Sequence, residues 1–344
     1  MSPLPQYTNM IHIGVVGYGY WGPNIVRNLS RFPSVSISWI CDLNPNTFVD
    51  IPRLYPTIRT TTSIQDVLSD PTTTAVIIAT PPKTHFTIAN QAIRVGKHVL
   101  VEKPMTCSVM EAKKLVAIAK AKKRILMVDH TYVYTPTIQK LKKIIDSDLL
   151  GSIYYIDSVR TNLGILQKDS NVIADLAVHD FSIIDYLFNK MPTSLSATGI
   201  TLEEIHQETV AHITARYPNG LFLHSHVSWL SPIKIRRMTL VGKKKMAIYD
   251  DIESSEKLKI YDKGVSFEHD PKQSYQLRIG YRNGAVMIPP THIEEGLFGV
   301  VKEFIHAIET KKSPITDGAM GLRVVRCLTK ATKSLQNGGI PIAV

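Results

Sequence analysis

A carboxylate and an imidazole lie four residues apart in the segment 174–187, at Asp175 and His179. The segment has the pattern of a helix, so both side chains are expected on one face of it. Imidazole exchanges a proton near neutral pH, and a neighbouring carboxylate orients it or favours its protonated form. The pair could act as an acid/base, although histidines on helices are more often structural.

A lysine follows another short apolar run. Lys103 comes directly after residues 98–102, where a buried strand is expected to end. Open α/β sheets bind ligands at the carboxyl ends of their strands, where a cation can hydrogen-bond a substrate oxygen and stabilise a developing alkoxide. The alternative is an ordinary surface lysine after a strand.

The glycines of Gly17-Tyr-Gly19-Tyr-Trp-Gly22 follow an apolar strand and open a helix. The first permits a tight turn, the second lets the backbone approach a pyrophosphate, and the third lets the helix pack on the strand. The start of the helix supplies N–H groups and positive dipole for phosphates. This context predicts a dinucleotide site.

An acidic residue, Asp42, ends the next strand, 20 positions beyond Gly22. Its carboxylate can accept both hydroxyls of an adenosine ribose and would repel a 2′-phosphate, which favours NAD(H) and leaves NADP(H) possible. A strand-end turn residue is the alternative.

Two further segments carry a family resemblance: ATPPKTH at residues 79–85 and GKHVLVEKP at residues 96–104. With the glycine motif, Asp175-x-x-x-His179 and the ending Asn-Gly-Gly at 337–339, the chain resembles the glucose-fructose oxidoreductase, inositol dehydrogenase and rhizopine-catabolism (Gfo/Idh/MocA) family along nearly its whole length. The resemblance implies an N-terminal Rossmann domain that binds NAD(P) and a C-terminal domain that holds a polyol, sugar or sugar nucleotide against the nicotinamide.

The resemblance also implies roles for single residues. Lys103 is expected near the nicotinamide and the reacting hydroxyl, His179 is expected to be the acid/base, and Asp175 its partner or a substrate ligand; other members have Tyr in place of this His and divide the roles differently. The residues expected along the cofactor are Gly17, Gly19, Tyr20, Trp21, Gly22, Asp42, Thr80, Pro81, His85, Glu102 and Lys103.

Aromatic and cationic residues near predicted strand ends suit a sugar ring carrying a diphosphate or carboxylate. The alternative for the segment 228–236 is a solvated basic hairpin with a core Trp. Segments 19–24 and 171–176 resemble most the sugar-nucleotide branch of the family, from which Ala174 and Val178 depart, so the substrate stays open. The predicted substrate contacts are Tyr134, Arg160, Asn162, Trp229, Lys234 and Arg236.

The elements that must position these residues fall into two halves. In the first, short β-branched runs alternate with helical stretches, which is typical of a parallel sheet covered by helices. The predicted strands are 11–16, 35–41, 75–79, 98–101 and 125–128, and the predicted helices are 24–31, 63–68, 85–95 and 109–122, the last with a capping box formed by Ser108 and Glu111.

Beyond residue 129 a series of longer alternating runs predicts a largely antiparallel sheet, with Asn219-Gly220 as a hairpin turn. The predicted strands are 153–160, 210–217, 221–228, 235–241 and 257–261, and the predicted helices are 137–146, 174–187, 294–309 and 319–335. The fold class is α/β: a Rossmann dinucleotide-binding domain over residues 1–130, and over residues 131–344 an α+β domain for substrate binding and oligomerisation, built on a large open sheet whose outer face we expect to join subunits into a dimer or tetramer.

Composition narrows the function. The net charge of +11 is spread along the 344 residues, without a helix-turn-helix or an aromatic and basic platform, so no nucleic-acid partner is predicted. No apolar run is long enough for a membrane helix and the start lacks a secretory layout, so a cytoplasmic protein is expected. Cys41, Cys107 and Cys327 lack disulfide or zinc spacing; we expect buried thiols and no metal site.

These observations and the resemblance predict an NAD(P)-dependent oxidoreductase that moves a hydride between nicotinamide and a hydroxyl or keto carbon of a sugar. The sugar is expected to be linked to a nucleotide, and the reacting carbon is expected to be carbon 3. An inositol or aldose dehydrogenase is the alternative of the same class. A non-catalytic, NAD-binding transcriptional regulator is the alternative of another class, against which the joint presence of Lys103, Asp175 and His179 argues.

Overall fold

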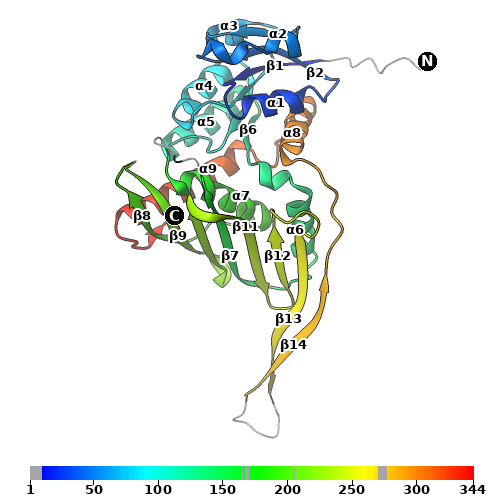
Figure 1. Cartoon of the computed structure of the whole chain (residues 1–344), viewed down its shortest axis with the longest axis vertical. Helices are drawn as coiled ribbons and strands as arrows, with labels where there is room; N and C mark the ends of the chain where they lie inside the picture. Colours follow the sequence, from blue (N-terminus) through cyan, green and yellow to red (C-terminus); the bar gives the residue numbers. More distant parts are fainter. Residues whose placement is uncertain (1–9, 165, 167–169, 205, 270–276) are drawn as a thin grey trace, which may run out of the picture. The chain divides into compact units, whose positions relative to one another are not determined.

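The computed structural model describes residues 10–164, 166, 170–204, 206–269 and 277–344 (Figure 1). The chain divides into two compact units. Unit 1 comprises Met1–Tyr134 and Glu294–Val325, and unit 2 comprises Thr135–Ile293 and Arg326–Val344. The sequence assigned everything after residue 130 to one domain, whereas residues 294–325 belong to unit 1.

Unit 1 contains a parallel sheet whose strand order is β3-β2-β1-β4-β5-β6. The order reverses between β1 and β4, and such a switch point opens a crevice at the carboxyl ends of the strands. The strands are β1 (Ile11–Val16), β2 (Val35–Cys41), β3 (Arg59–Thr61), β4 (Ala75–Ile78), β5 (His98–Glu102) and β6 (Leu126–Asp129).

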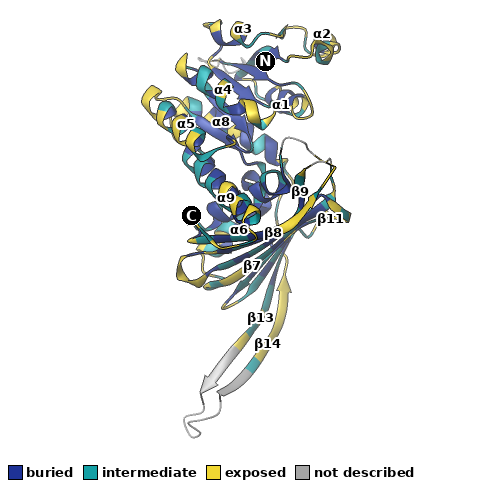
Figure 2. Cartoon of the chain, turned by 90° about the vertical axis from the view of Figure 1, so that its left-hand side faces the viewer, coloured by how far each residue is buried: buried dark blue, intermediate teal, exposed yellow. Residues whose placement is uncertain are grey.

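Helices pack on this sheet through apolar side chains, and their outer sides face solvent, as Figure 2 shows along α5. Ser108 Oγ accepts a hydrogen bond from Glu111 N at 3.2 Å, which confirms the predicted start of α5. The helices are α1 (Gly22–Leu29), α2 (Ile51–Leu54), α3 (Ile64–Ser69), α4 (Pro82–Arg94), α5 (Val109–Lys122) and α8 (Gly296–Thr310), while α9 (Gly318–Gln336) starts in unit 1 and ends in unit 2.

The returning segment is held at the β6 edge of the sheet. Val128 N donates to Thr316 O at 2.9 Å, and Thr316 Oγ1 donates to Val128 O at 2.7 Å. Phe298 of α8 stacks on Phe32, which follows α1, with ring centroids 4.9 Å apart. These contacts satisfy backbone groups and apolar surface that a domain ending at residue 130 would leave exposed.

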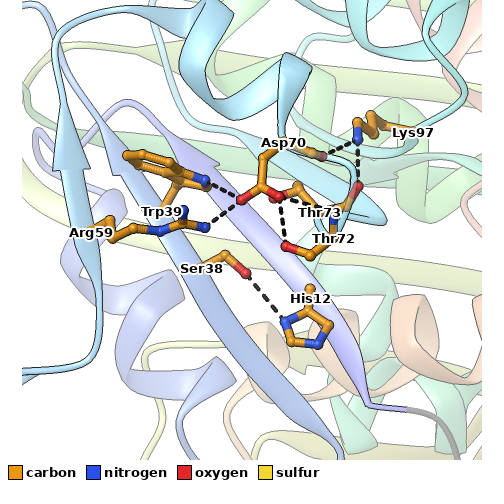
Figure 3. A network of polar contacts seen from close by, with 8 residues as sticks. All are labelled: His12, Ser38, Trp39, Arg59, Asp70, Thr72, Thr73 and Lys97. Carbon is orange, nitrogen blue, oxygen red and sulfur yellow. Dashed lines mark hydrogen bonds and ion pairs between the residues drawn. The ribbon is translucent and has the colours of Figure 1, made fainter.

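A polar network lies at the opposite end of the sheet from the crevice (Figure 3). Asp70, in the loop before β4, accepts from the Thr72 hydroxyl, from Trp39 Nε1 at 2.8 Å and from Arg59. These bonds, that of Thr72 foremost, hold the pKa of the Asp70 carboxyl well below its usual range. Lys97 Nζ donates to two backbone carbonyl oxygens of the same loop. The network ties the edge strand β3 to the loop before β4.

The described part of unit 2 forms one sheet of order β14-β13-β12-β11-β7-β10-β9-β8-β15. The neighbours β7 and β10 are parallel and the other neighbours are antiparallel, so the predicted largely antiparallel sheet is confirmed. The strands are β7 (Ile153–Leu163), β8 (Ser194–Leu202), β9 (Gln207–Arg216), β10 (Phe222–Ser228), β11 (Leu230–Gly242), β12 (Met246–Asp250), β13 (Leu258–His269), β14 (Leu277–Met287) and β15 (Ile342–Ala343).

The two faces of this sheet differ. One is packed against α7 (Val178–Phe188), which a π-helical segment, Ile173–Ala177, precedes; α6 (Pro136–Asp146) also packs on α7. The other face carries half-exposed polar residues, including His212 and His226, whose rings stack 4.2 Å apart, and His224, whose Nδ1 lies 2.7 Å from Asp157 Oδ1. This second face is the one on which the sequence predicts subunit contacts.

The hairpin turn, the cysteines and the lengths of the helices can be compared with what the sequence predicts. Asn219 and Gly220 both have positive φ, 66° and 80°, between the antiparallel strands β9 and β10, so the predicted hairpin is confirmed. Cys41 and Cys327 are buried, but Cys107 is exposed, because it lies in the loop between β5 and α5. No described helix is long and apolar enough to span a bilayer.

Candidate active site

The glycine loop of unit 1 is shaped for close approach of the backbone. Gly17 has φ +94°, and a Cβ there would lie 2.5 Å from Ala79 O, so only glycine lets the loop pack beside the end of β4. At Gly19 a Cβ would meet no described atom within 4 Å. Tyr20 and Trp21 are exposed, and the first turn of α1 contains no acidic residue. The loop and the N-terminus of α1 therefore fit a pyrophosphate.

Asp42 has a turn role that the sequence offered as its alternative. Its Oδ2 accepts from Tyr18 N at 2.6 Å, and its Oδ1 accepts from Asn44 N at 2.8 Å. The carboxylate thus fixes the glycine loop and its own turn. Each oxygen keeps further acceptor capacity, so the same carboxylate can also accept ribose hydroxyls.

His85 is fully buried, with both ring nitrogens facing backbone oxygens. Nε2 lies 2.7 Å from Thr80 O and Nδ1 lies 2.9 Å from Pro104 O. Burial lowers the pKa of His85, so the ring is neutral and donates to only one of the two. His85 joins the loop after β4 to the loop after β5, whereas Pro81 is exposed and Thr80 is half-buried. The resemblance placed His85 along the cofactor; in the structure its ring nitrogens contact the protein backbone, and its place along the cofactor stays a prediction.

Glu102 and Asp129 end the adjacent parallel strands β5 and β6 in register with each other. Both are buried, at 8% and 3% exposure. Burial raises the pKa of Glu102 well above its usual range, and the nearby Asp129 charge raises it further. The sequence placed Glu102 beside the cofactor and did not identify Asp129.

Lys103 follows Glu102 directly, and the Lys103–Pro104 peptide bond is cis. Lys103 N donates to Glu102 Oε2 at 3.3 Å. His130 is completely buried, and neither ring nitrogen has a hydrogen-bond partner among the described residues. Burial, with the charge of Lys103, lowers the pKa of His130 to about 3, so the ring is neutral. The carboxyl edge of unit 1 therefore collects a lysine, two acids and a neutral imidazole.

In unit 2, Asp175 lies in the π-helical segment rather than in the regular helix that its spacing predicts. Such segments are frequent at functional sites. Trp229, in the bend between β10 and β11, donates from Nε1 to Asp175 Oδ2 at 3.0 Å. His179 lies on the first turn of α7. The side chains of Asp175 and His179 are both half-buried. The indole thus orients the carboxylate of the predicted pair, a contact that sequence spacing could not reveal.

Two of the predicted substrate cations have partners inside unit 2. Arg160 is 2% exposed and donates from Nε to Asp180, which also accepts from Ser225 Oγ at 2.7 Å. Arg236 donates to Thr161 O at 2.9 Å and to the side-chain oxygen of Asn162. Alternation along β7 turns the Arg160 side chain towards Asp180 of α7, and its contact with substrate stays a prediction. Arg236 and Asn162 bind each other.

The predicted aromatic contacts are also buried. Trp229 is 1% exposed and Tyr134 is 4% exposed. Tyr134 OH bonds to Thr316 Oγ1 at 3.0 Å inside unit 1 and accepts from Thr316 N at 3.2 Å. Neither ring offers a free face to a sugar. Lys234 alone of the predicted substrate residues is exposed.

Comparisons with known proteins agree with these features. Residues 11–130 match the model described as "Oxidoreductase family, NAD-binding Rossmann fold", and residues 138–248 match the "GFO/IDH/MocA C-terminal domain". UDP-N-acetylglucosamine 3-dehydrogenase of Acidithiobacillus ferrooxidans is 26% identical over 326 residues, which cover 92% of this chain and 95% of that protein. The uncharacterized oxidoreductase YrbE of Bacillus subtilis is 25% identical over 62% of this chain and 65% of its own length.

Solved structures show the same fold. The structure of the Acidithiobacillus ferrooxidans enzyme has a TM-score of 0.81 at 22% identity and covers 95% of this chain and 98% of its own. GenD2 from gentamicin A biosynthesis, solved in complex with NAD, has a TM-score of 0.81 at 20% identity, with 98% of this chain and 97% of its own covered. With both of its halves matched by family models, the chain belongs to the Gfo/Idh/MocA oxidoreductase family, and its unit 1 is the family's NAD-binding Rossmann fold.

Proposed function

We propose that the protein is an NAD(H)-dependent sugar-nucleotide 3-dehydrogenase or 3-ketoreductase. The observation that carries this proposal is the match to UDP-N-acetylglucosamine 3-dehydrogenase over 92% of the chain, which spans both units. A similarity confined to the Rossmann half would support a nucleotide site without indicating a substrate. The substrate class is thus a pyranose linked to a nucleoside diphosphate.

The cofactor would lie along the glycine loop. Asp42, whose carboxylate is already oriented by Tyr18 N and Asn44 N, would accept the two ribose hydroxyls and repel a 2′-phosphate. The N-terminus of α1 would face the pyrophosphate. Bound nicotinamide supplies the hydride acceptor or donor. His85 would act indirectly, by holding the loops after β4 and β5 together.

The chain's own residues would manage the proton. When a hydroxyl-bearing carbon gives up a hydride, its oxygen must lose a proton, and the developing alkoxide needs an acceptor and a positive charge. His179 would be the acceptor, Asp175 would align it, and Lys103 would supply the charge. The bond from Trp229 Nε1 supports the proposed alignment, since it fixes the carboxylate.

For the nucleotide phosphates, Lys234 is the remaining cationic candidate among the residues that the sequence singled out. It is exposed, whereas Arg160 and Arg236 are buried by their own partners. A flexible ammonium can pair with a diphosphate as a point charge. Arg236 and Asn162 would then shape the bend between β10 and β11 rather than bind substrate.

The experiment is a survey of purified protein with NAD⁺ or NADH and a panel of UDP-sugars, their 3-keto forms, inositols and free aldoses. We expect nicotinamide absorbance to change with a nucleotide sugar, and mass spectrometry to detect a keto product two hydrogens lighter. Turnover with inositol or aldose alone would replace the proposed substrate class. Cofactor binding without turnover on any of them would favour the regulator.

We further propose that the half-exposed face of the unit 2 sheet joins subunits. The apolar Tyr155 of β7 is 44% exposed on that face, and exposed apolar patches commonly mark interfaces. Light scattering is expected to report a dimer or tetramer, and a Tyr155→Glu variant should shift it towards the monomer. A monomeric wild type at all working concentrations would contradict this.

A further inference from the structure

Two acidic side chains face each other in the interior of unit 1. Glu102 and Asp129 are the last residues of β5 and β6, they pair across the parallel strands, and they are only 8% and 3% exposed. Adjacent parallel strands place such residues within about 5 Å of each other. Two ionised carboxylates at this separation, away from water, would repel strongly.

Two buried carboxyl groups that pair across adjacent parallel strands avoid this repulsion when they share one proton. An ionised carboxylate only accepts, so a carboxyl-to-carboxyl bond forms when one partner is protonated. Asp129 already accepts from Thr131 Oγ1, which favours its ionised form. Glu102 accepts the longer bond from Lys103 N. Burial raises the pKa of both carboxyl groups, and the bond from the Thr131 hydroxyl lowers that of Asp129, so we assign Glu102 as the donor and Asp129 as the acceptor.

The surrounding titratable groups fix the local charge. Lys103 interacts electrostatically with both acids and with the imidazoles of His85 and His130. Both imidazoles are neutral because they are buried. The net charge of this cluster is therefore set by the Lys103 ammonium and by the combined charge of Glu102 and Asp129.

We propose that Glu102 and Asp129 share one proton, so that the buried pair presents a single negative charge to Lys103 and holds its ammonium in place. Both acids are positioning residues, with Asp129 as the counter-ion and Glu102 as the group that keeps that counter-ion oriented. The consequence for catalysis rests on the proposed function, whereas the shared proton and the counter-ion do not.

The shared proton can be seen directly by infrared difference spectroscopy at pH 7. Wild type minus Glu102→Gln is expected to show the carbonyl stretch of a protonated carboxylic acid, shifted in D₂O. Wild type minus Glu253→Gln, which removes an exposed carboxylate, should show none. A Glu102 difference spectrum without the acid band would overturn the proposal, whatever the protein's substrate.

The counter-ion is tested by the rate at which an acetylating reagent modifies Lys103, read by peptide mass spectrometry, because only the uncharged amine reacts. Glu102→Gln keeps Asp129 and its charge, so the rate should stay near that of wild type. Glu102→Gln/Asp129→Asn removes the charge, and the rate should rise about 10-fold or more, as expected for loss of a close opposite charge. The exposed Lys190 serves as the internal control and should react equally in all three proteins.

Equal rates for Lys103 in the double variant and in wild type would overturn the counter-ion role. A rise already complete in Glu102→Gln would show that Glu102 and not Asp129 carries the negative charge, which overturns the assignment of Asp129 as the counter-ion. Should the double variant fail to fold, the infrared spectrum and the Glu102→Gln rate still decide. If both assays succeed while no sugar is turned over, the proposed function fails and this inference stands.

Discussion

The carboxyl edge of the unit 1 sheet and the covered face of the unit 2 sheet both hold charged residues that the sequence singles out, yet they use them differently. In unit 1, parallel strands end at one edge, so Glu102, Lys103 and Asp129 gather there. In unit 2, the position of Arg160 along β7 turns its side chain inward, where it pairs with Asp180. Charged residues at the ends of adjacent parallel strands are brought together even when buried, whereas a charge within a strand of a sheet covered on one side meets a partner from the covering helix only if alternation turns it inward.

The proposed catalytic residues, Lys103 of unit 1 and His179 of unit 2, give the largest expected effect. Lys103→Ala and His179→Ala should each lower turnover about 10² to 10⁴-fold, because positioned acid/base groups contribute that much. The affinity for NADH should change much less, since the proposed phosphate and ribose contacts lie along the glycine loop. Steady-state kinetics and NADH fluorescence titration provide the two numbers. Near-normal turnover in both variants would refute the mechanism, and loss in Lys103→Ala alone would move the acid/base role to the lysine.

The buried ion pair of Arg160 and Asp180 in unit 2 is expected to affect the free energy of unfolding rather than turnover. Asp180→Ala leaves the Arg160 guanidinium buried without its carboxylate, which should reduce the free energy of unfolding by about 3–5 kcal/mol. Asp157→Ala is the matched control, because Asp157 lies on β7 like Arg160 but on the exposed face of the sheet. Loss of its pair with His224 should lower the free energy of unfolding by less than about 1 kcal/mol. Urea unfolding of the three proteins gives the comparison. Equal losses in both variants would mean that burial does not distinguish the two faces.

His130 should make the stability of unit 1 depend on pH. Its pKa is about 3 in the folded protein against an ordinary 6.5, so only the unfolded chain takes up its proton between these values. Its contribution is therefore intact above pH 6.5 and declines as the pH falls towards 3. Between pH 6.5 and 5.0 we expect a loss on the order of 2 kcal/mol from this residue. His130→Asn should unfold with a shallower pH dependence than wild type; parallel curves would show that the imidazole is not buried neutral.

The smallest effect concerns the choice of cofactor. Wild type should bind NAD(H) more tightly than NADP(H), and Asp42→Ser should narrow that ratio by about tenfold, as for loss of one hydrogen bond to a charged group. Because Asp42 also holds Tyr18 N and Asn44 N, both affinities should fall in Asp42→Ser. Asp42→Asn keeps an acceptor for the loop and removes only the charge. Titration with both cofactors decides, and tighter binding of NADP(H) by wild type would contradict the assignment.

Where hydrophobic periodicity is strong, the sequence predicts the fold closely. The bounds of β1, β2 and α5 agree to the residue, because each combines a buried apolar pattern with a defined start or end. The strands β3, β8, β12, β14 and β15 were not predicted, and β3 and β15 are only three and two residues long. β8 and β14 lie near the margins of their sheet and contain glycine, and β12 is short, so none shows a sustained alternation.

The site was predictable where neighbouring residues in the sequence also share a place in the fold. The glycine loop, Asp42 and Lys103 are local to strand ends, and the strand-end rule that selects Lys103 could also have selected Asp129 and His130 after β6. Trp229 bonding Asp175 and Asp180 pairing Arg160 join residues 54 and 20 positions apart. Spacing carries no information about such partners, so the sequence could not show that Arg160, Trp229 and Tyr134 are buried.

The chain passes between the two units three times, after Tyr134, after Ile293 and after Val325. Neither unit is therefore one continuous stretch of polypeptide. During synthesis the β6 edge must wait for Thr316 to leave the ribosome, so the nucleotide-binding half cannot finish folding until most of the protein has been made. A gene fusion that contains only the first 130 residues would lack the segment that covers the β6 edge, so this fragment would not fold completely. Because each unit consists of two separate stretches of chain, a single recombination event would not transfer either unit whole.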